Sequence, residues 1–297
     1  MKKFILIIFC FHLNLLWAQE MLSFMPNSPF YTSLGFDIIE TELIRQKNMQ
    51  ADQQFKIGDK KRIGIQLRGQ TLENDLKEIP NFKALSFGLS TQSNLAEGKT
   101  IGASISYGSA SDQLFKKSRD STLQVNTIYH HSPKWIWLVN YSNNRPFLNN
   151  VPLPGFIYIQ EHSRERTIML GFPVIFINQA FFQSQASLNY FGLMPFQHQL
   201  RFYYNKLWLR PFIQFEQTVS MFFNSAREAR QMRTFWFERR GSFGLEKALG
   251  PVLRLSLVGG YAFDRKFFEA KTFGNNRSSK TLVKDGSFLG FNLRSMF

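Results

Sequence analysis

Apolar and polar residues alternate with a period of two along most of this chain. In residues 100–107, for example, Ile101, Ala103 and Ile105 are separated by small or polar residues. Neighbouring side chains of a strand point to opposite faces, so this alternation predicts a strand with one apolar and one polar face. The same alternation occurs in residues 62–68, 84–90, 182–190, 253–257 and 289–297.

Helical spacing is rare by comparison. The best helical candidate, residues 38–53, contains several apolar residues but no sustained apolar stripe. Short clusters of Gly, Pro, Asn, Asp and Ser separate the alternating segments and indicate turns. The sequence therefore predicts an all-β, antiparallel, up-and-down meander with turns at residues 58–61, 94–99, 131–134, 193–195 and 249–251.

Two architectures use many amphipathic strands: a soluble sandwich or barrel with an apolar interior, and a membrane barrel with an apolar exterior. The polar faces here are rich in Ser, Gly, Gln and Asn and poor in Lys and Glu, which is typical of an enclosed lumen. Aromatic residues gather near strand ends, as in the girdles of membrane barrels. We therefore predict a transmembrane β-barrel, with a soluble secreted β-sandwich that binds anionic surfaces as an alternative. The candidate girdle residues are Trp135, Trp137, Tyr203, Tyr204, Phe235, Trp236 and Phe237.

The number of strands is harder to predict than their presence. About 15 segments alternate, whereas single-chain bacterial barrels have an even number of strands. Residues 166–179 are apolar on both faces and contain Pro173, which a strand interior disfavours, and residues 51–57 are a second weak segment. We predict about 12 to 14 strands. Residues 222–233 and 266–284 are predicted as outer loops, and residues 249–251 as a turn at the periplasmic end.

The first residues have the pattern of a secretory signal peptide. Lys2 and Lys3 precede a dense apolar run, and Ala18 is the expected last residue removed. Residues 1–18 are thus predicted as a signal peptide and residues 19–297 as an outer-membrane barrel domain. Beyond the first twenty residues, no stretch approaches the roughly 18 to 20 apolar residues of a membrane-spanning helix. The single cysteine, Cys10, lies within the signal, so the mature chain offers neither a thiol nucleophile nor a Cys-ligated metal.

The chain is basic, with 36 Lys and Arg against 21 Asp and Glu, a formal net charge of +15. Without Lys2 and Lys3 the mature chain has 34 − 21 = +13. Because the basic residues are scattered and the chain is exported, anionic lipids, lipopolysaccharide or small anionic solutes are expected partners, and nucleic acid is not. No cofactor is implied.

The C-terminus carries a resemblance to known outer-membrane barrels. The last alternating strand ends in Phe297, which is similar to the terminal signal that the barrel assembly machinery recognises. Residues 145–155 and the barrel-length remainder resemble an uncharacterised outer-membrane β-barrel family of Gram-negative bacteria, of the Bacteroidota type. The resemblance implies location and fold, and it implies no activity.

A segment rich in proline and asparagine is the most distinctive local feature. Three prolines within nine residues rule out both a helix and a paired strand. The segment is either a rigid outer loop or a loop folded into the lumen as a constriction. Its candidate residues are Arg145, Phe147, Asn149, Pro152 and Pro154.

Arginines on polar faces would make an enclosed lumen positive and bias it toward anionic solutes. These lumen candidates are Arg68, Arg201, Arg254 and Arg294. A second arginine group is predicted to form a basic outer loop, which either grips lipopolysaccharide phosphates or is simply solvated. That loop contains Arg227, Arg230, Arg233, Arg239 and Arg240, with Glu228 and Glu238 between them.

A hydrolase is the enzymatic alternative to passive solute passage. An outer-membrane lipid hydrolase would need a Ser and a His that face one another. Adjacent residues of a strand point to opposite faces, so His131 with Ser132, and His162 with Ser163, cannot form a pair without a turn. The spacing of His130, His131, His162 and His198 is also unsuitable for a metal site. We therefore predict a non-enzymatic outer-membrane barrel that is structural or passes small solutes.

Overall fold

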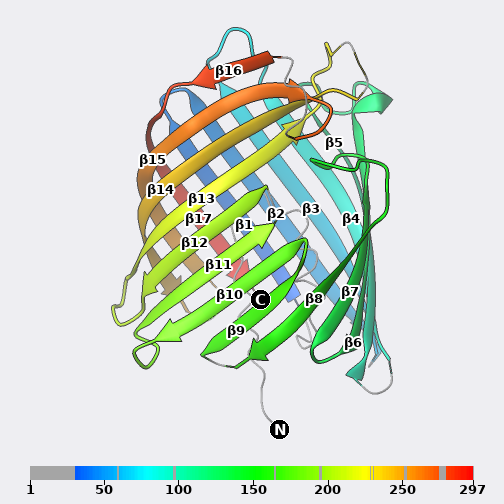
Figure 1. Cartoon of the computed structure of the whole chain (residues 1–297), viewed down its shortest axis with the longest axis vertical. Coiled ribbons are helices and arrows are strands. Elements are labelled where there is room, and N and C mark those ends of the chain that lie inside the picture. Colours follow the sequence, from blue (N-terminus) through cyan, green and yellow to red (C-terminus); the bar gives the residue numbers. More distant parts are fainter. Residues whose placement is uncertain are drawn as a thin grey trace.

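The alternating segments form seventeen strands whose backbone pairing closes a barrel in the computed structural model (Figure 1). The structure describes residues 31–58, 60–95, 98–163, 165–193, 196–227, 229, 231–250, 253–273 and 279–296. The predicted signal peptide, Cys10 and Phe297 lie outside these residues. The strands are β1 Tyr31–Thr41, β2 Ile44–Ile57, β3 Lys61–Asn74, β4 Phe82–Asn94, β5 Thr100–Ser111, β6 Ser121–Ser132, β7 Trp135–Ser142, β8 Leu153–His162, β9 Arg166–Phe172, β10 Val174–Phe181, β11 Ala186–Leu193, β12 Gln197–Tyr204, β13 Arg210–Phe222, β14 Arg233–Leu249, β15 Leu253–Ala270, β16 Ser279–Val283 and β17 Gly286–Met296, and the 3-10 turn η2 spans Ser118–Asp120.

Sixteen of these strands make the ring. Each strand pairs antiparallel with the next, and β1 closes the ring on β17 through pairs from Ser33–Met296 to Thr41–Phe288. The long strand β15 pairs with β17 along its first half and with the short β16 along its second half, so β16 lies outside the ring. The prediction of an antiparallel closed barrel is confirmed, and the predicted 12 to 14 strands are too few.

The missing strands lie in the two segments that the alternation left in doubt. Residues 166–179 form β9 and most of β10, which pair from Ile175–Leu170 to Gln179–Arg166 around Pro173. Pro173 is the connection between the strands and needs no ladder hydrogen bond, which explains why it is tolerated. Residues 51–57 are the second half of β2 and pair fully with β3. Strands β9 and β10 escape a strict alternation test because residues 168–175 are apolar on both faces.

The helical candidate, residues 38–53, consists of the end of β1, a two-residue turn and most of β2. In the part of the chain that the structure describes, no helix is long and apolar enough to cross a membrane.

Long and short connections lie at opposite ends of the barrel. The connections 75–81, 112–120, 143–152 and 223–232 lie at one end, together with β16 (Figure 1), and they mark it as the outer end. Loop 223–232 agrees with the predicted outer loop at residues 222–233. The predicted loop 266–284 is wrong in extent, because Lys266–Ala270 continue β15 and Ser279–Val283 form β16.

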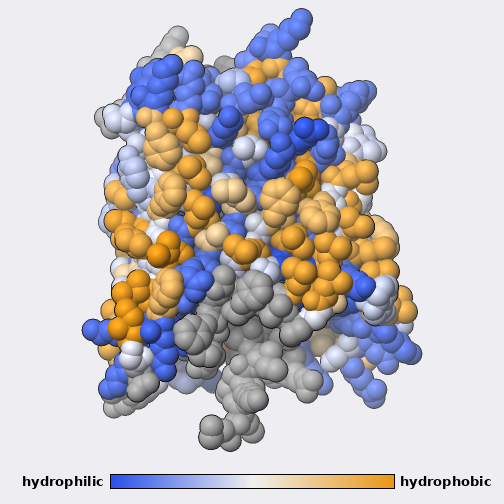
Figure 2. Space-filling view, turned by 180° about the vertical axis from the view of Figure 1, so that it is seen from behind, coloured by the Kyte–Doolittle hydropathy of each residue, from blue (hydrophilic) through white to orange (hydrophobic). Residues whose placement is uncertain are grey.

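The outer surface is apolar around its middle. Phe87 on β4 is 55% exposed and Ile105 on β5 is 48% exposed, while Leu85 and Leu255 are partly exposed. Figure 2 shows, on one face of the barrel, hydrophobic residues gathered around mid-height, with hydrophilic residues above them and at the lower edges. In water such a band would cost roughly 25 cal/mol for each Å² exposed, so it fits lipid and excludes the soluble sandwich.

The predicted aromatic girdle is only partly on the outside. Trp135, Trp137 and Tyr204 are exposed on the outer surface. Tyr203 points inward, as expected for the neighbour of an outward residue on a strand. Phe235, Trp236 and Phe237 are buried, because the outer end of β14 is covered on both faces by other parts of the barrel.

The position of the apolar band predicts where charge is tolerated. Leu89→Lys, in the middle of the outer face of β4, should reduce the free energy of unfolding in a bilayer by about 2–4 kcal/mol. Ser93→Lys, at the periplasmic end of the same face, should cost about 0–1 kcal/mol. Urea titration of liposome-embedded protein, followed by heat-modifiable gel mobility, measures both. Equal costs at the two positions would contradict the placement of the band.

Candidate functional site

The outer ends of β13–β15 lean across the lumen and meet the opposite wall. β13 lies eight strands from β5 in the ring of sixteen, yet the Phe223 amide donates to the Ala110 carbonyl at 2.7 Å. Ser111 and Phe223 also form an isolated parallel β-bridge. Three residues before Phe223 on β13, Ser220 Oγ accepts a hydrogen bond from Gln70 Nε2 on β3 at 3.2 Å. These contacts join opposite sides of the barrel and narrow its outer mouth.

An apolar cluster, here called the mouth plug, fills the space between the two walls. The rings of Phe82 on β4 and Phe222 on β13 stack with centroids 4.9 Å apart. Trp236 and Phe267 lie with centroids 4.5 Å apart beside them. All four side chains are fully buried, and burying each large side chain contributes on the order of 1.5–3 kcal/mol. The mouth plug consists of Ile44, Leu72, Phe82, Ala110, Phe222, Trp236, Phe267 and Val283.

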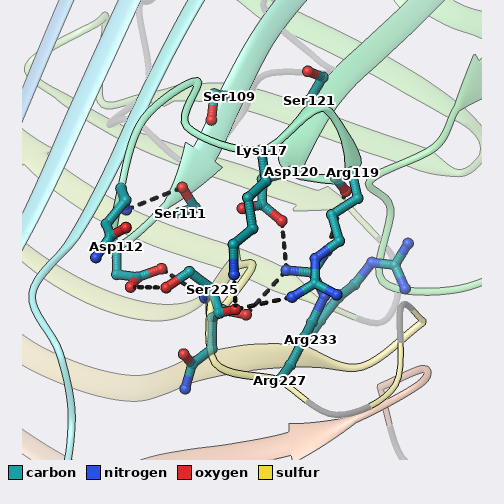
Figure 3. Close-up of polar contacts among 12 residues, drawn as sticks. Ser109, Ser111, Asp112, Lys117, Arg119, Asp120, Ser121, Ser225, Arg227 and Arg233 are labelled. Atoms are coloured by element: carbon teal, nitrogen blue, oxygen red, sulfur yellow. Dashed lines mark hydrogen bonds and ion pairs between the residues drawn. The ribbon is translucent and has the colours of Figure 1, made fainter.

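A group of polar contacts above the mouth plug, here called the latch, joins loops 112–120 and 223–232 (Figure 3). The Asp112 carboxylate accepts hydrogen bonds from the backbone N–H of Ser225 at 2.7 Å and from its hydroxyl at 2.5 Å. Lys117 Nζ and an Arg119 guanidinium nitrogen both donate to the Ser225 carbonyl, at 2.7 and 2.9 Å. Ser225 is therefore held on both its amide and its carbonyl side.

The strongest contact of the latch is a buried ion pair. Arg227 Nη1 lies 2.6 Å from Asp120 Oδ1, and both side chains are almost completely buried. The Arg227 guanidinium also lies over the Phe223 ring, 4.6 Å from its centroid, and donates to the Arg119 carbonyl. Removing one partner of such a pair leaves a buried charge uncompensated, which costs about 3–5 kcal/mol. The latch thus fastens loop 223–232 to the opposite wall.

The segment rich in proline is an ordered loop whose centre is Arg145. The guanidinium donates to the carbonyls of Phe147 at 2.8 Å and Val151 at 2.8 Å, and also to that of Leu148. It donates to the side chain and carbonyl of Asn140 as well. Asn149 Oδ1 closes the loop by accepting a hydrogen bond from the backbone N–H of Arg145 at 2.7 Å. Burial lowers the pKa of the Arg145 guanidinium below its ordinary value. Arg145 therefore organises the loop itself.

The two later prolines behave differently from expectation. Pro152 is exposed in the loop, but Pro154 is part of β8 and pairs with Val139 on β7. The prediction that this segment excludes a paired strand is therefore wrong at Pro154. On the other side, β9 pairs with β8 only from Phe156 onward, so this edge of β8 is open at Pro154. A proline is tolerated at such an open edge.

Loop 143–152 also packs against neighbouring loops. The Phe147 ring stacks on Phe196 with centroids 5.2 Å apart, and Phe196 meets Phe273 edge to face at 5.3 Å. The Phe273 amide donates to the Pro146 carbonyl at 2.8 Å. Arg233 at the start of β14 donates to the Asn143 carbonyl at 2.7 Å. The loop is thereby joined to three other segments of the outer end.

A cavity of about 140 Å³ lies inside the barrel beside these loops. Its wall includes the inner faces of β3–β7, the loop residues 144–147 and three residues of β13. Its remaining side is formed by Pro173 and Phe196, which belong to the outer connections of the short strands β9–β12. These strands end below the outer ends of β13–β15 in Figure 1. The cavity is therefore bordered by turns, and not by tall strands, on that side.

The four predicted lumen arginines occupy the inner wall, but in unequal surroundings. Arg68 and Arg201 are buried, and Arg201 donates to Gln214 Oε1 at 2.7 Å and to the Tyr203 hydroxyl at 2.6 Å. Arg254 and Arg294 face each other as direct cross-strand partners and are only partly buried. The latter two are thus the more accessible to a solute in the lumen.

The predicted basic loop is divided between several places. Arg227 and Arg233 are buried in contacts at the outer end, Arg239 lies in β14 within 3.4 Å of Asp264, and Glu228 and Arg230 lie outside the described residues. Arg240 and Glu238 lie inside the barrel, where Arg240 also pairs with Glu216 at 3.5 Å. The prediction of one solvated or lipopolysaccharide-binding loop is therefore wrong, because the segment continues into a strand that faces the lumen.

The inner wall of β6–β10 is unexpectedly apolar. Ile128, Ile136, Leu138, Ile157 and Met169 form a buried cluster there. Residues 168–175, which are apolar on both faces, are the sequence signal for it. Alternation alone predicts a polar inner face on every strand and therefore does not predict this apolar inner surface.

The histidine and serine candidates for a hydrolase are separated. Ser132 Oγ accepts the backbone amides of Lys134 and Trp135, and Ser163 Oγ is bonded to the Arg166 backbone. His198 Nδ1 is 2.9 Å from the Tyr190 hydroxyl. The side chain of His162 is not among those that the structure describes. No group of three potential metal ligands occurs among the described residues.

No family model and no curated protein matches the chain. Solved structures that are similar include the Acinetobacter baumannii outer membrane protein Omp33, at 9% identity and TM-score 0.35 over 91% of this chain and 98% of that one. The COG4313 outer membrane channel from Pseudomonas putida F1 has 11% identity and TM-score 0.34 over 92% and 97%. The P. putida toluene transporter TodX has 10% identity and TM-score 0.36 over 93% and 91%.

The barrel itself decides the cellular location. A closed antiparallel barrel with an apolar outer band and charged side chains inside is the architecture of outer-membrane barrels. The chain is an outer-membrane β-barrel protein.

The latch can be tested by proteolysis. Asp120→Ala should speed trypsin cleavage after Lys116 or Lys117 at least about tenfold, because the lost ion pair is worth more than the 1.4 kcal/mol of a tenfold change. Cleavage is followed on intact cells by gel electrophoresis. Glu40→Ala removes an exposed ion pair with Arg45 at the same end and should change nothing. An unchanged rate in Asp120→Ala would show that the latch does not hold the loop.

Proposed function

We propose that this protein is a passage barrel for small solutes whose outer mouth is closed at rest, and that it is not an enzyme. The observation that carries the proposal is the contact of β13 with β3–β5 across a sixteen-stranded ring. Rings of about 16 to 18 strands are wide enough for an aqueous channel. The Ser111–Phe223 bridge and the side-chain contacts of the mouth plug are separate from the pairing of neighbouring strands, so they can break without unfolding the barrel.

The lower lumen supports a bias toward anions. Arg68, Arg201, Arg254 and Arg294 contribute positive charge to the inner wall. Some carboxylates of the lumen form ion pairs with other arginines. Glu216 and Glu238, for example, both pair with Arg240. Rings or clusters of one charge select ions of the opposite sign in narrow pores. Ions that pass the barrel are therefore expected to be preferentially anionic.

The first test opens the mouth plug. Phe222→Ala removes the ring that stacks on Phe82 across the lumen, at a cost of about 3–5 kcal/mol for a buried Phe. Conductance in planar bilayers should rise at least severalfold, whereas Phe243→Ala, an exposed aromatic on the outer face of β14, should leave it unchanged. A folded Phe222→Ala barrel with wild-type conductance would contradict a closed passage.

The second test concerns ion preference. In the Phe222→Ala background, Arg254→Glu with Arg294→Glu should shift the reversal potential in a KCl gradient toward cation preference. Lys61→Glu with Lys83→Glu changes the net charge equally but alters exposed residues on the outer face, and should leave the reversal potential unchanged. Unaltered selectivity in the arginine double variant would remove the proposed anion bias.

Partners follow from the location of the barrel. Outer-membrane lipids and lipopolysaccharide are proposed to surround it, and the barrel assembly machinery is proposed to insert it through the terminal strand. Phe297, the proposed assembly signal, lies outside the described residues. Within the predicted basic segment, the partly exposed Arg239 of β14 is the remaining described candidate for a phosphate contact.

A further inference from the structure

We infer that the luminal cavity beside loop 143–152 is a binding site for a small uncharged amphiphile that carries a hydrogen-bond donor. The inference rests on the proposed passage function, because the cavity lies on the inner face of the barrel at its outer end. It names one class of small molecule that binds at the outer end of the passage, in addition to the ions expected in the lower lumen.

Size sets the first limit on the ligand. The cavity volume is about 140 Å³. An apolar cavity of roughly 150 Å³ is known to accommodate benzene, so one ring with a small substituent is the expected scale. Longer chains do not fit unless the surrounding loops move.

The two sides of the cavity differ in chemistry. Phe147, Phe196, Val219 and Met221 form an apolar side, together with Pro146 and Pro173. The facing inner walls of β4–β7 contribute mostly hydroxyl and amide groups. These polar lining residues are Ser86, Ser106, Ser109, Thr122, Gln124 and Ser142. A ligand that satisfies both sides has an apolar body and a polar end.

Charge excludes a carboxylate or an ammonium ligand. Arg145 is the one charged residue that lines the cavity, among the residues that the structure describes. Its guanidinium is directed at the carbonyls of its own loop and at Asn140. An ion in the cavity would lose hydration without gaining a dedicated counter-charge, which is costly.

The side chain of Gln197 indicates that the polar group of the ligand is a hydrogen-bond donor. Gln197 lines the cavity at the start of β12 and is only 6% exposed. Its Oε1 is buried and accepts no hydrogen bond from the described residues. A buried acceptor without a donor costs about as much as a lost hydrogen bond, and a ligand O–H or N–H would remove that cost. The same inner surface continues into Gln199 and Thr218, whose buried polar atoms are also without donors or acceptors in the described part.

The test uses three fluorinated probes on the full barrel in detergent, observed by ¹⁹F relaxation. 4-Fluorophenol should bind, 4-fluorotoluene should bind about fivefold more weakly for want of one hydrogen bond, and 4-fluorobenzoate should bind least. Benzoate binding equal to that of the phenol would overturn the ligand class. Absence of binding by all three would overturn the site, while leaving the conductance experiments on the passage function unaffected.

Matched variants locate the site. Thr122→Leu fills the cavity from the inner face of β6 and should reduce 4-fluorophenol binding at least tenfold. Thr127→Leu places the same substitution on the exposed outer face of the same strand and should leave binding unchanged. Equal binding in both would place the ligand elsewhere and overturn the inference. If Thr122→Leu lacks the heat-modifiable mobility of a folded barrel, Ser106→Leu on β5 replaces it with the same expectation.

Gln197→Leu separates the hydrogen bond from the shape of the site. This variant should weaken the binding of 4-fluorophenol about fivefold and leave the binding of 4-fluorotoluene unchanged. The two probes should then bind with equal affinity. Equal weakening of the binding of both probes would show that Gln197 only supports the wall, and would overturn its assignment as the hydrogen-bond acceptor for the ligand.

Discussion

The contact between opposite walls at the outer mouth is the interaction on which the other features depend. A ring of sixteen strands encloses a space too wide for ordinary side chains of one wall to fill. The long strands β13–β15 remove that space by leaning over the lumen, so that Phe222 reaches Phe82 and Ser220 reaches Gln70. Because the bent strand ends need apolar partners, the inner face at this level is aromatic and not polar.

The bend of β13–β15 also explains the arrangement of the loops. The inner face of these strand ends meets β2–β5 through the mouth plug, and their outer face is covered by Phe147, Phe196 and Phe273. Loop 143–152 is thereby joined to residues 271–273 and to Arg233, while loop 223–232 is latched to loop 112–120. These segments share contacts, so movement of one disturbs the others. Opening of the mouth is expected to be collective for this reason.

The interior is divided by chemistry as well as by depth. Buried arginines and glutamates pair on β13–β15, where Arg240 contacts both Glu216 and Glu238. A buried pair recovers much of its desolvation cost only when both partners are present, which favours a fixed network on this wall. The inner wall of β6–β9 instead carries a buried apolar cluster of Ile128, Ile136, Leu138, Ile157 and Met169. A solute in the lumen therefore meets fixed ion pairs on one wall and an apolar cluster on another.

The sequence by itself determined the all-β class, the outward apolar face and most turns, because side-chain alternation is a local property of an extended chain. Residues such as Phe87 and Ile105 could be assigned to lipid without any knowledge of their neighbours. Only the tertiary structure decided the strand number and the closed mouth. Pairing around Pro173 adds two neighbouring strands to the ring, and the approach of Asp120 to Arg227 joins residues far apart in it. Local periodicity contains no information about which distant strand ends meet, since their contact depends on how the whole sheet bends and closes.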